Sequence, residues 1–405
     1  MYLNSIVKFL CLALSVSINA FSEDWPQWRG PNHNATVTGF VAPSVWPETL
    51  TKVWTVEVGK GDASPALVDG KLYTFSRIEN KEIVRCLNAV DGKEIWQNTY
   101  DSIKVTGVAS SHSGPRSSPA VADGKVVTFG VGGVLTCFEA SSGRILWRKQ
   151  DFTKDLPRHK PATSPLILDG MCIVQVGALK TGMIAAFDLD DGTERWRVDN
   201  EPPGYASPAV MVIDGEKHIV ALTHENLLGI SPADGKILWQ SRFVSNITST
   251  NSITPMVFGQ NVFIAAKHRG TRVIRISKLD DGYRAQKLWD KTKVRMAFNT
   301  PVTNNGLIFA LGQTKKLFCL NSETGDLVWK DATRRDHFGT IVNAESVIFL
   351  LPSTGVLTAF EPNGEGYKEL ANYHVSDSPT FSYPVISGNK IYIQDQDAIT
   401  LWSIK

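Results

Sequence analysis

The chain has 405 residues, of which 42% are apolar and 20% charged, and its 42 basic and 40 acidic side chains leave a formal net charge of +2. This composition is typical of a soluble globular protein. The near-neutral charge, without a basic run, excludes a nucleic-acid binder, whose phosphate contacts need a concentrated Lys and Arg surface. A chain of this length forms two or three domains unless it closes into one ring of repeats.

Residues 1–22 are predicted to be a secretory signal peptide. Lys8 precedes an apolar stretch from Phe9 to Ile18, and Asn19-Ala20-Phe21-Ser22 supplies the small residues of a cleavage site after Ser22 or Ala20. The apolar stretch is shorter than the roughly 20 residues that a membrane helix needs. We therefore expect an exported protein, periplasmic or secreted, without a membrane span.

The chain after the signal peptide repeats itself. Ser64 opens the segment SPALVDGKLYTF, Ser118 opens SPAVADGKVVTF and Ser164 opens SPLILDG, while each copy ends in a segment such as DGKEIW. The prolines and tryptophans recur every 40 to 54 residues, a period typical of propeller blades. The closing tryptophans of the first six copies are Trp96, Trp147, Trp196, Trp239, Trp289 and Trp329.

Each copy is predicted to form a four-stranded antiparallel sheet, because short runs of Val, Ile, Leu and Phe alternate with Asp-Gly turns. The seventh copy is degraded, with Tyr373 in place of the tryptophan, and the eighth begins at Ser382 and has only three strands. Residues 52–56 read as the missing closing strand. The sequence therefore predicts an all-β, eight-bladed β-propeller over residues 52–405, closed by an N-terminal strand that completes the last blade.

Residues 23–51 are expected to form an extension packed on the outside of the ring through Trp25, Trp28 and Trp46. Four cysteines follow the signal peptide. Cys86, Cys137 and Cys319 occupy one repeat position, where other copies have Ala186, Ala359 or Gly229. A position that accepts only small residues indicates tight packing, so these cysteines and Cys172 are interpreted as small buried thiols rather than a disulfide framework.

The S-P-x-x-x-D-G openings and A-x-D/T-G-K-x-x-W endings resemble those of the pyrroloquinoline-quinone (PQQ) repeat family of eight-bladed propellers over residues 52–405. The segment DWPQWRGPN from Asp24 is also similar to the start of secreted bacterial proteins of this family. The resemblance implies two alternative functions, because the same ring occurs in quinone-dependent dehydrogenases and in non-enzymatic outer-membrane assembly scaffolds. The repeated tryptophans are interpreted as packing between neighbouring blades.

Candidate binding residues come from the loops that enter each innermost strand and the loops that join second and third strands. In a propeller these loops meet on one face around the central channel. Imidazole and guanidinium groups on such a face predict a small anionic or polyhydroxylated ligand, and solvated polar loops are the alternative. No metal site is expected, since the histidines come from separate blades. The candidates are His112, Arg116, His159, Lys180, His224, Glu225, His268, Arg269, Arg295, Asn299, His337 and Asp395.

A bound PQQ with calcium would need cations for its carboxylates and oxygen ligands for the metal. Arg116, Lys180, Arg269 and Arg295 are the candidate clamps, and Glu225, Asn299 and Asp395 the candidate oxygen donors. Two features that the resemblance implies for family enzymes are missing, namely an adjacent Cys-Cys pair and a tryptophan in the loops of this face. We therefore predict a scaffold, without cofactor, that holds a protein or polymer partner; the alternative is a PQQ-dependent alcohol or sugar dehydrogenase.

Overall fold

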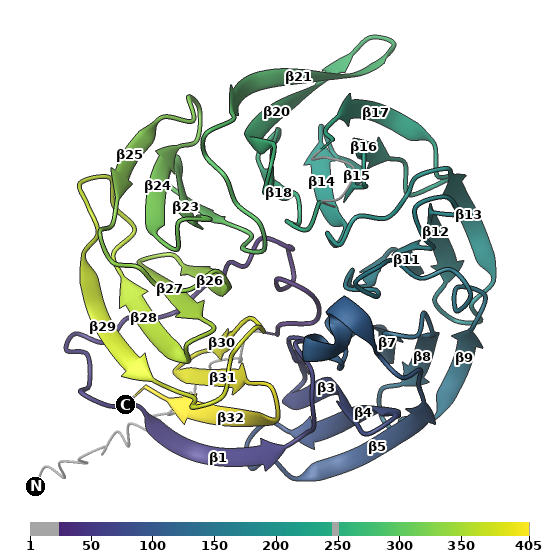
Figure 1. Cartoon of the computed structure of the whole chain (residues 1–405), viewed down its shortest axis with the longest axis horizontal. Coiled ribbons are helices and arrows are strands. Elements are labelled where there is room, and N and C mark those ends of the chain that lie inside the picture. Colours follow the sequence, from purple (N-terminus) through teal and green to yellow (C-terminus); the bar gives the residue numbers. More distant parts are fainter. Residues whose placement is uncertain (1–23, 245–250, 405) are drawn as a thin grey trace, which may run out of the picture.

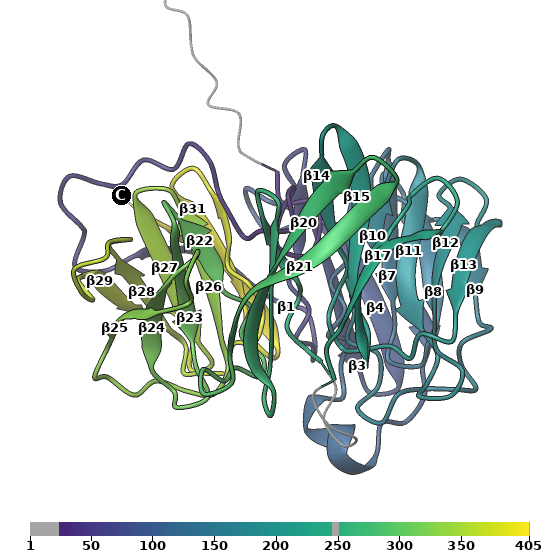
Figure 2. The same ribbon diagram turned by 90° about the horizontal axis from the view of Figure 1, so that it is seen from above.

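The computed structural model describes residues 24–244 and 251–404, so the predicted signal peptide lies outside the described residues. Eight four-stranded antiparallel sheets are arranged as the blades of a ring around one central axis, and we call the space about this axis the channel (Figure 1). Figure 2 shows the ring from the side as a thick disc. The predicted all-β, eight-bladed propeller is confirmed. The only helix in the described part of the chain is the six-residue 3-10 helix η1 (Gly107–His112), which is too short to cross a membrane.

The blades follow one another in chain order, from the innermost to the outermost strand. Blades 1 and 2 are β2 (Ala66–Val68), β3 (Lys71–Ile78), β4 (Lys81–Asn88), β5 (Glu94–Asp101), and β6 (Ala120–Ala122), β7 (Lys125–Phe129), β8 (Leu135–Glu139), β9 (Ile145–Lys149). Blades 3 and 4 are β10 (Leu166–Leu168), β11 (Met171–Val176), β12 (Met183–Asp188), β13 (Glu194–Asp199), and β14 (Ala209–Ile213), β15 (Glu216–Leu222), β16 (Asn226–Ile230), β17 (Ile237–Arg242).

The second half of the ring repeats this order. Blades 5 and 6 are β18 (Met256–Phe258), β19 (Asn261–Ala266), β20 (Gly270–Leu279), β21 (Gly282–Lys291), and β22 (Val302–Asn304), β23 (Leu307–Leu311), β24 (Leu317–Asn321), β25 (Leu327–Lys330). Blades 7 and 8 are β26 (Gly339–Ala344), β27 (Val347–Pro352), β28 (Val356–Phe360), β29 (Glu369–His374), and β30 (Val385–Ser387), β31 (Lys390–Gln394), β32 (Ala398–Ser403) with β1 (Thr51–Glu57).

The ring closes in blade 8, where the N-terminal β1 pairs antiparallel with the C-terminal β32. Thr55 lies opposite Thr400, and their hydroxyl oxygens are 3.0 Å apart. This pairing confirms the prediction that an N-terminal strand completes the last blade. It covers the edge of β32 that would otherwise be free to pair with another chain.

The two faces of the disc carry different connections. We call the loop face the side with the loops that enter the innermost strands and those that join second to third strands. We call the turn face the side with the hairpin turns that join first to second and third to fourth strands. In Figure 2 the blue η1 projects from the loop face, and the purple N-terminal segment lies at the turn face.

Tryptophans of the outer strands join six of the eight blades to the next one. In six blades the indole N–H donates to a carbonyl oxygen in the last turn of the following blade, at 2.8–3.0 Å, and in blade 4 Trp239 instead donates to Nδ1 of His218 in its own blade. In five of these turns the tryptophan ring of one blade covers a glycine with positive φ in the next blade. This contact explains why the repeat keeps both the glycine and the tryptophan of its Gly-Lys-x-x-Trp ending. The six joining tryptophans are Trp54, Trp96, Trp147, Trp196, Trp289 and Trp329.

The small-residue position of the repeat lies directly across from the tryptophan on the neighbouring strand. Cys86, for example, faces Trp96, and an added Cβ at Gly229 would lie 1.9 Å from the ring of Trp239. Cys86, Cys137, Cys172 and Cys319 are all buried as separate thiols, which confirms their interpretation. In blade 7 the same register places Ala371, not Tyr373, opposite Ala359. The assignment of Tyr373 to the tryptophan position was wrong by two residues, a shift that keeps a side chain on the same face of a strand.

The Ser/Thr-Pro openings form a belt of hydrogen bonds around the channel. The backbone N–H of the Ser or Thr donates to the hydroxyl of the equivalent residue in the next blade, as Ser64 does to Ser118 at 2.9 Å. Equivalent bonds run from Ser118 to Ser164 and from Ser164 to Ser207. Tyr383 occupies the same position in blade 8 and donates its N–H to Ser64 across the point of ring closure. The hydroxyl is therefore part of the blade-to-blade contact.

The N-terminal segment, residues 24–50, lies differently from the expected course outside the ring. Residues 25–37 cross the channel at the turn face (Figure 1). Trp25 pairs through its backbone with Leu67 of blade 1, and the indole N–H of Trp28 donates to Thr254 before blade 5. Arg29 is fully buried, and its guanidinium donates to five neutral oxygens, two of which are the carbonyls of residues 300 and 301. An irregular segment has no periodicity from which this course could be predicted.

The rest of the segment packs on blade 7. The rings of Phe40 and Trp46 lie 5.3 and 6.2 Å from that of Phe349, and the hydroxyl of Tyr373 donates to the carbonyl of Pro47. These contacts cover the blade in which alanine replaces the outer tryptophan. Tryptophans do anchor the segment, as expected. Only Trp46, however, lies away from the channel, whereas Trp25 and Trp28 belong to the part that crosses it.

Candidate functional site

The loop face is centred on an aromatic cluster that no single blade could supply. His112, Phe298, Phe338 and Phe381 come from the loops that enter blades 2, 6, 7 and 8. Phe298 stacks on Phe338 with ring centroids 4.6 Å apart, and the edges of Phe338 and His112 meet Phe381 at 5.3 and 4.8 Å. The ring topology therefore brings together side chains that lie more than 260 residues apart in sequence.

Of the predicted candidates, His112 belongs to this cluster, and Arg116 and His159 are linked to it by hydrogen bonds. Nδ1 of His112 lies 2.7 Å from the carboxylate of Asp62, which fixes the imidazole beside Phe381. The guanidinium of Arg116 donates to the backbone carbonyls of His112 and His159, and burial lowers its pKa. The His159 ring packs against Tyr205 with centroids 5.7 Å apart, and partial burial lowers the pKa of its imidazole. Arg116 thus ties two loops together instead of presenting its charge to a ligand.

Four other candidates have their polar groups occupied by the fold. Asn299 is buried, and its amide group bonds the backbone of Leu311, His337 and Gly339. Asp395 accepts hydrogen bonds from Ser376 and from two N–H groups of its own turn. Arg269 makes a two-pronged ion pair with Asp290, and Glu225 lies 3.4 Å from Arg242. His224 is 6% exposed, and its Nδ1 has no hydrogen-bond partner among the described residues.

The remaining candidates, Lys180, His268, Arg295 and His337, are exposed on the loop face. Of their side chains, only that of Arg295 makes a hydrogen bond to another described residue, from Nε to the carbonyl of Thr292 at 3.4 Å. All twelve candidates thus lie in loops of the predicted face, yet they do not converge on one point. A small ligand held jointly by them stays a prediction, with the exposed Lys180 and Arg295 as its most available cations.

The residues of this face do not fit a quinone held by calcium. The oxygen donors proposed for the metal, Glu225, Asn299 and Asp395, are engaged separately by an arginine, by backbone groups and by a turn. Two of the four clamping cations, Arg116 and Arg269, are likewise committed. Within residues 24–244 and 251–404, no three His, Cys, Asp or Glu side chains group closely enough to hold a metal ion.

The residues that the sequence analysis missed on this face are apolar. Val108 of η1, Leu179 between β11 and β12, and Phe298 before blade 6 are 54%, 56% and 51% exposed. Large apolar side chains in loops cost solvation free energy unless something covers them. Their signal in the sequence is that they are large apolar residues in loops, outside the strand pattern, which a choice of candidates by charge and polarity leaves out.

A family model described as outer membrane protein assembly factor BamB matches residues 79–294 and 275–404. The chain belongs to this BamB-type family of PQQ-repeat propellers. The outer membrane protein assembly factor BamB of Yersinia pestis is 24% identical over 366 residues, which cover 85% of this chain and 86% of that protein. The crystal structure of BamB from Moraxella catarrhalis superposes with a TM-score of 0.67 at 15% identity, covering 88% of this chain and 98% of that one.

Dehydrogenases share the propeller with BamB-type chains. The quinohemoprotein alcohol dehydrogenase ADH IIB of Pseudomonas putida is 26% identical over 150 residues, which cover 36% of this chain and 21% of that protein. A europium-containing methanol dehydrogenase superposes with a TM-score of 0.69 at 11% identity, covering 94% of this chain and 98% of that one. At such identities the structural likeness shows the fold alone. In sequence, the BamB of Yersinia pestis matches 85% of this chain, whereas the alcohol dehydrogenase ADH IIB matches 36%.

Proposed function

We propose that the protein is an exported, non-enzymatic scaffold that holds a partner protein on its loop face during the assembly of outer-membrane proteins. The support from relatives is the match to assembly factors over most of both chains. In this proposal residues 1–22 direct export and the mature propeller acts in the periplasm or after secretion. The exposed apolar side chains of the loop face carry the proposal.

The chemistry of the loop face suits a protein partner. Val108, Leu179 and Phe298 are the kind of exposed apolar side chains that a partner buries at the centre of an interface. Phe298 is held rigidly by stacking on Phe338, so it loses little conformational entropy on binding. Exposed Lys180 follows Leu179 directly, and Arg295 precedes Phe298 by three residues. A partner with an apolar centre and acidic edges would complement this surface.

The proposal is tested in a strain of the source organism that lacks the protein. The full chain is restored as wild type, as Leu179→Asp and as Phe298→Ser, and the amount of folded outer-membrane β-barrel protein is measured by its mobility shift on heating. Both loop-face variants should restore much less than the wild type. The matched control is Val41→Asp, at an apolar residue of the N-terminal segment that is 85% exposed. Full restoration by both loop-face variants, or no defect in the deletion strain, would overturn the proposal.

The alternative function, a PQQ-dependent alcohol or sugar dehydrogenase, makes a different prediction. The mature protein would bind PQQ with Ca²⁺ in a calorimeter and reduce a dye in the presence of alcohols or aldoses. We expect neither heat nor turnover, because the oxygen donors and half of the cations are engaged elsewhere. Tight binding with turnover would replace the scaffold proposal with this one.

A further inference from the structure

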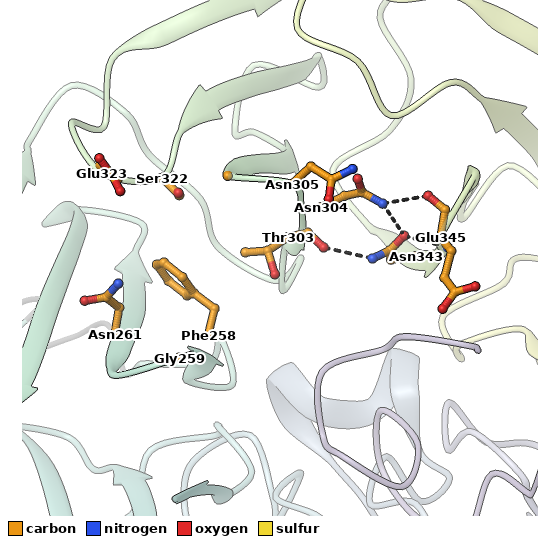
Figure 3. Close-up of a pocket in the computed structure, with 11 residues that line it drawn as sticks. Phe258, Gly259, Asn261, Thr303, Asn304, Asn305, Ser322, Glu323, Asn343 and Glu345 are labelled. Carbon is orange, nitrogen blue, oxygen red and sulfur yellow. Dashed lines mark hydrogen bonds between the residues drawn. The ribbon is translucent and has the colours of Figure 1, made fainter. Parts of the chain in front are cut away.

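The turn face carries a hollow that is separate from the loop face and from the proposed scaffold function. It has a volume of about 650 Å³ and lies where the turns of blades 5, 6 and 7 meet. Figure 3 shows Phe258 and Asn261 of blade 5 on one side and Thr303, Asn304 and Asn305 of blade 6 on the other. The volume is within the range of small-molecule sites, roughly 300–1,000 Å³.

The repeat itself shows that this region is unusual. The last two residues of each innermost strand lie opposite the first residues of the second strand, and blades 1 to 5 have two apolar residues there, such as Leu67 and Val68. Blade 6 has Thr303 and Asn304 instead, and blade 7 has Asn343 at the first of the two positions. Polar side chains thus replace apolar ones in adjacent blades, at the wall of the hollow.

The amides of this wall form a fixed network with one acceptor left over. The Nδ2 of Asn304 donates to Oδ1 of Asn343 at 3.0 Å and to the carbonyl of Glu345 at 2.7 Å, while Nδ2 of Asn343 donates to the carbonyl of Thr303 (Figure 3). These donors settle which atom of each amide is nitrogen. The Oδ1 of Asn304, a residue that is 9% exposed, accepts no hydrogen bond from any described residue.

Other groups around the hollow are free to bind. Asn261 uses Oδ1 to accept from Arg275, which leaves its Nδ2 as a donor, and the exposed side chain of Asn305 has no partner among the described residues. The carboxylates of Glu323 and Glu345 have no ion-pair partner in the described part of the chain, and no Lys or Arg lines the hollow. Carboxylates without cations repel anions, which excludes phosphates and acidic ligands.

We propose that this hollow binds a neutral carbohydrate. Sugar hydroxyls both donate and accept, so they match a wall of amides and carboxylates that offers free Nδ2 donors and free oxygen acceptors. The half-buried ring of Phe258 supplies an apolar surface for the C–H face of a pyranose. The negative charge of the hollow disfavours an anion, and its many polar groups disfavour a wholly apolar molecule. A neutral sugar fits both these features and the single aromatic ring.

The test uses variants that restore the ordinary residue of the repeat and therefore preserve the fold. Asn305→Asp introduces the aspartate that blades 1 to 4 have at this turn. Asparagine and aspartate both tolerate the φ of +46° at position 305. Phe258→Leu introduces the leucine of the equivalent Leu168. Asp123→Asn, the reverse exchange in blade 2, is the matched control. Binding of maltose, cellobiose and N,N′-diacetylchitobiose to the full mature chain is measured by calorimetry and saturation-transfer NMR.

The wild type and Asp123→Asn should bind at least one of these disaccharides equally. Asn305→Asp and Phe258→Leu should weaken that binding by about tenfold, the loss expected for one contact, without lowering the melting temperature. Leu179→Asp, on the loop face, should bind the sugar as the wild type does, which separates this result from the scaffold proposal. Absence of binding by the wild type, undiminished binding by both repeat-restoring variants, or equal loss in Asp123→Asn would overturn the inference.

Discussion

At the scale of single residues, glycines under tryptophan rings hold neighbouring blades together. Gly192 has a φ of +73°, and an added Cβ would lie 2.8 Å from the ring of Trp147. Gly170, in the same blade, has a φ of +71° but no atom within 4 Å of such a Cβ. Both glycines thus have a positive φ, but only Gly192 lies in close contact with a tryptophan ring.

This pair predicts two different losses of stability. Gly170→Ala should lower the free energy of unfolding by about 1 kcal/mol, the cost of a left-handed alanine. Gly192→Ala should lose a further 1–3 kcal/mol or so, because the methyl group displaces the ring of Trp147. Urea denaturation of both variants measures the difference. Equal losses would show that the contact with the tryptophan adds nothing.

The residue His33 predicts a pH dependence. His33 is 6% exposed beside the buried Arg29, and burial lowers the pKa of its imidazole to about 4. The unfolded chain, with a histidine pKa near 6.5, takes up the proton first, so this residue's contribution to stability is complete above pH 6.5 and is lost as the pH falls towards 4.

The wild type should therefore lose roughly 3 kcal/mol more unfolding free energy between pH 7 and pH 4 than His33→Asn does. Asparagine tolerates the φ of +54° at this position, so the variant should fold. Denaturation curves at the two pH values provide the measurement. Parallel pH profiles of the two proteins would mean that residues 25–37 are not packed in the channel.

At the scale of elements, the innermost strands are connected by their opening hydroxyls. The Ser/Thr-Pro openings of the repeat indicated where the innermost strands begin, and the Asp-Gly turns indicated which strands pair as hairpins. Strand order and blade boundaries could therefore be predicted from local patterns. The role of the hydroxyl could not, because its partner Ser118 lies 54 residues from Ser64. A contact of that kind requires the closed ring.

Ser118→Ala should cost about 1–2 kcal/mol of unfolding free energy, because the N–H of Ser64 is left without its acceptor in the buried belt. The adjacent Ser117 is the control, since it is also buried but its hydroxyl has no hydrogen-bond partner among the described residues. Ser117→Ala should change stability by less than about 0.5 kcal/mol. Thermal and urea unfolding compare the two, and similar effects would exclude the belt as a stabilising element.

At the scale of the whole molecule, closure of the ring and the course of residues 25–37 are separate properties. The number of blades and the lent strand β1 followed from counting repeats, and the position of the twelve candidate residues on one face followed from the topology. Their contacts did not follow, since whether Asn299 meets a ligand or the backbone depends on distances that no motif encodes. The N-terminal crossing of the channel was missed for the same reason.

Two deletions separate these properties. Removing residues 24–57 takes away β1 and exposes the edge of β32, so the protein should form concentration-dependent oligomers. Removing only residues 24–50 keeps β1, so that variant should stay monomeric and melt at a lower temperature than the wild type. Light scattering after size-exclusion chromatography measures both masses. A monomeric product of the longer deletion would contradict the account of closure.

The scaffold proposal is tested most directly by photo-crosslinking in cells of the source organism. A photoreactive residue is placed at Leu179, at Phe298 or at the control position Val41, and the crosslinked products are identified by mass spectrometry. We predict that positions 179 and 298 crosslink to the same component of outer-membrane protein assembly and that position 41 does not. A crosslink to that component from position 41 alone, or none from the loop face, would contradict the central claim.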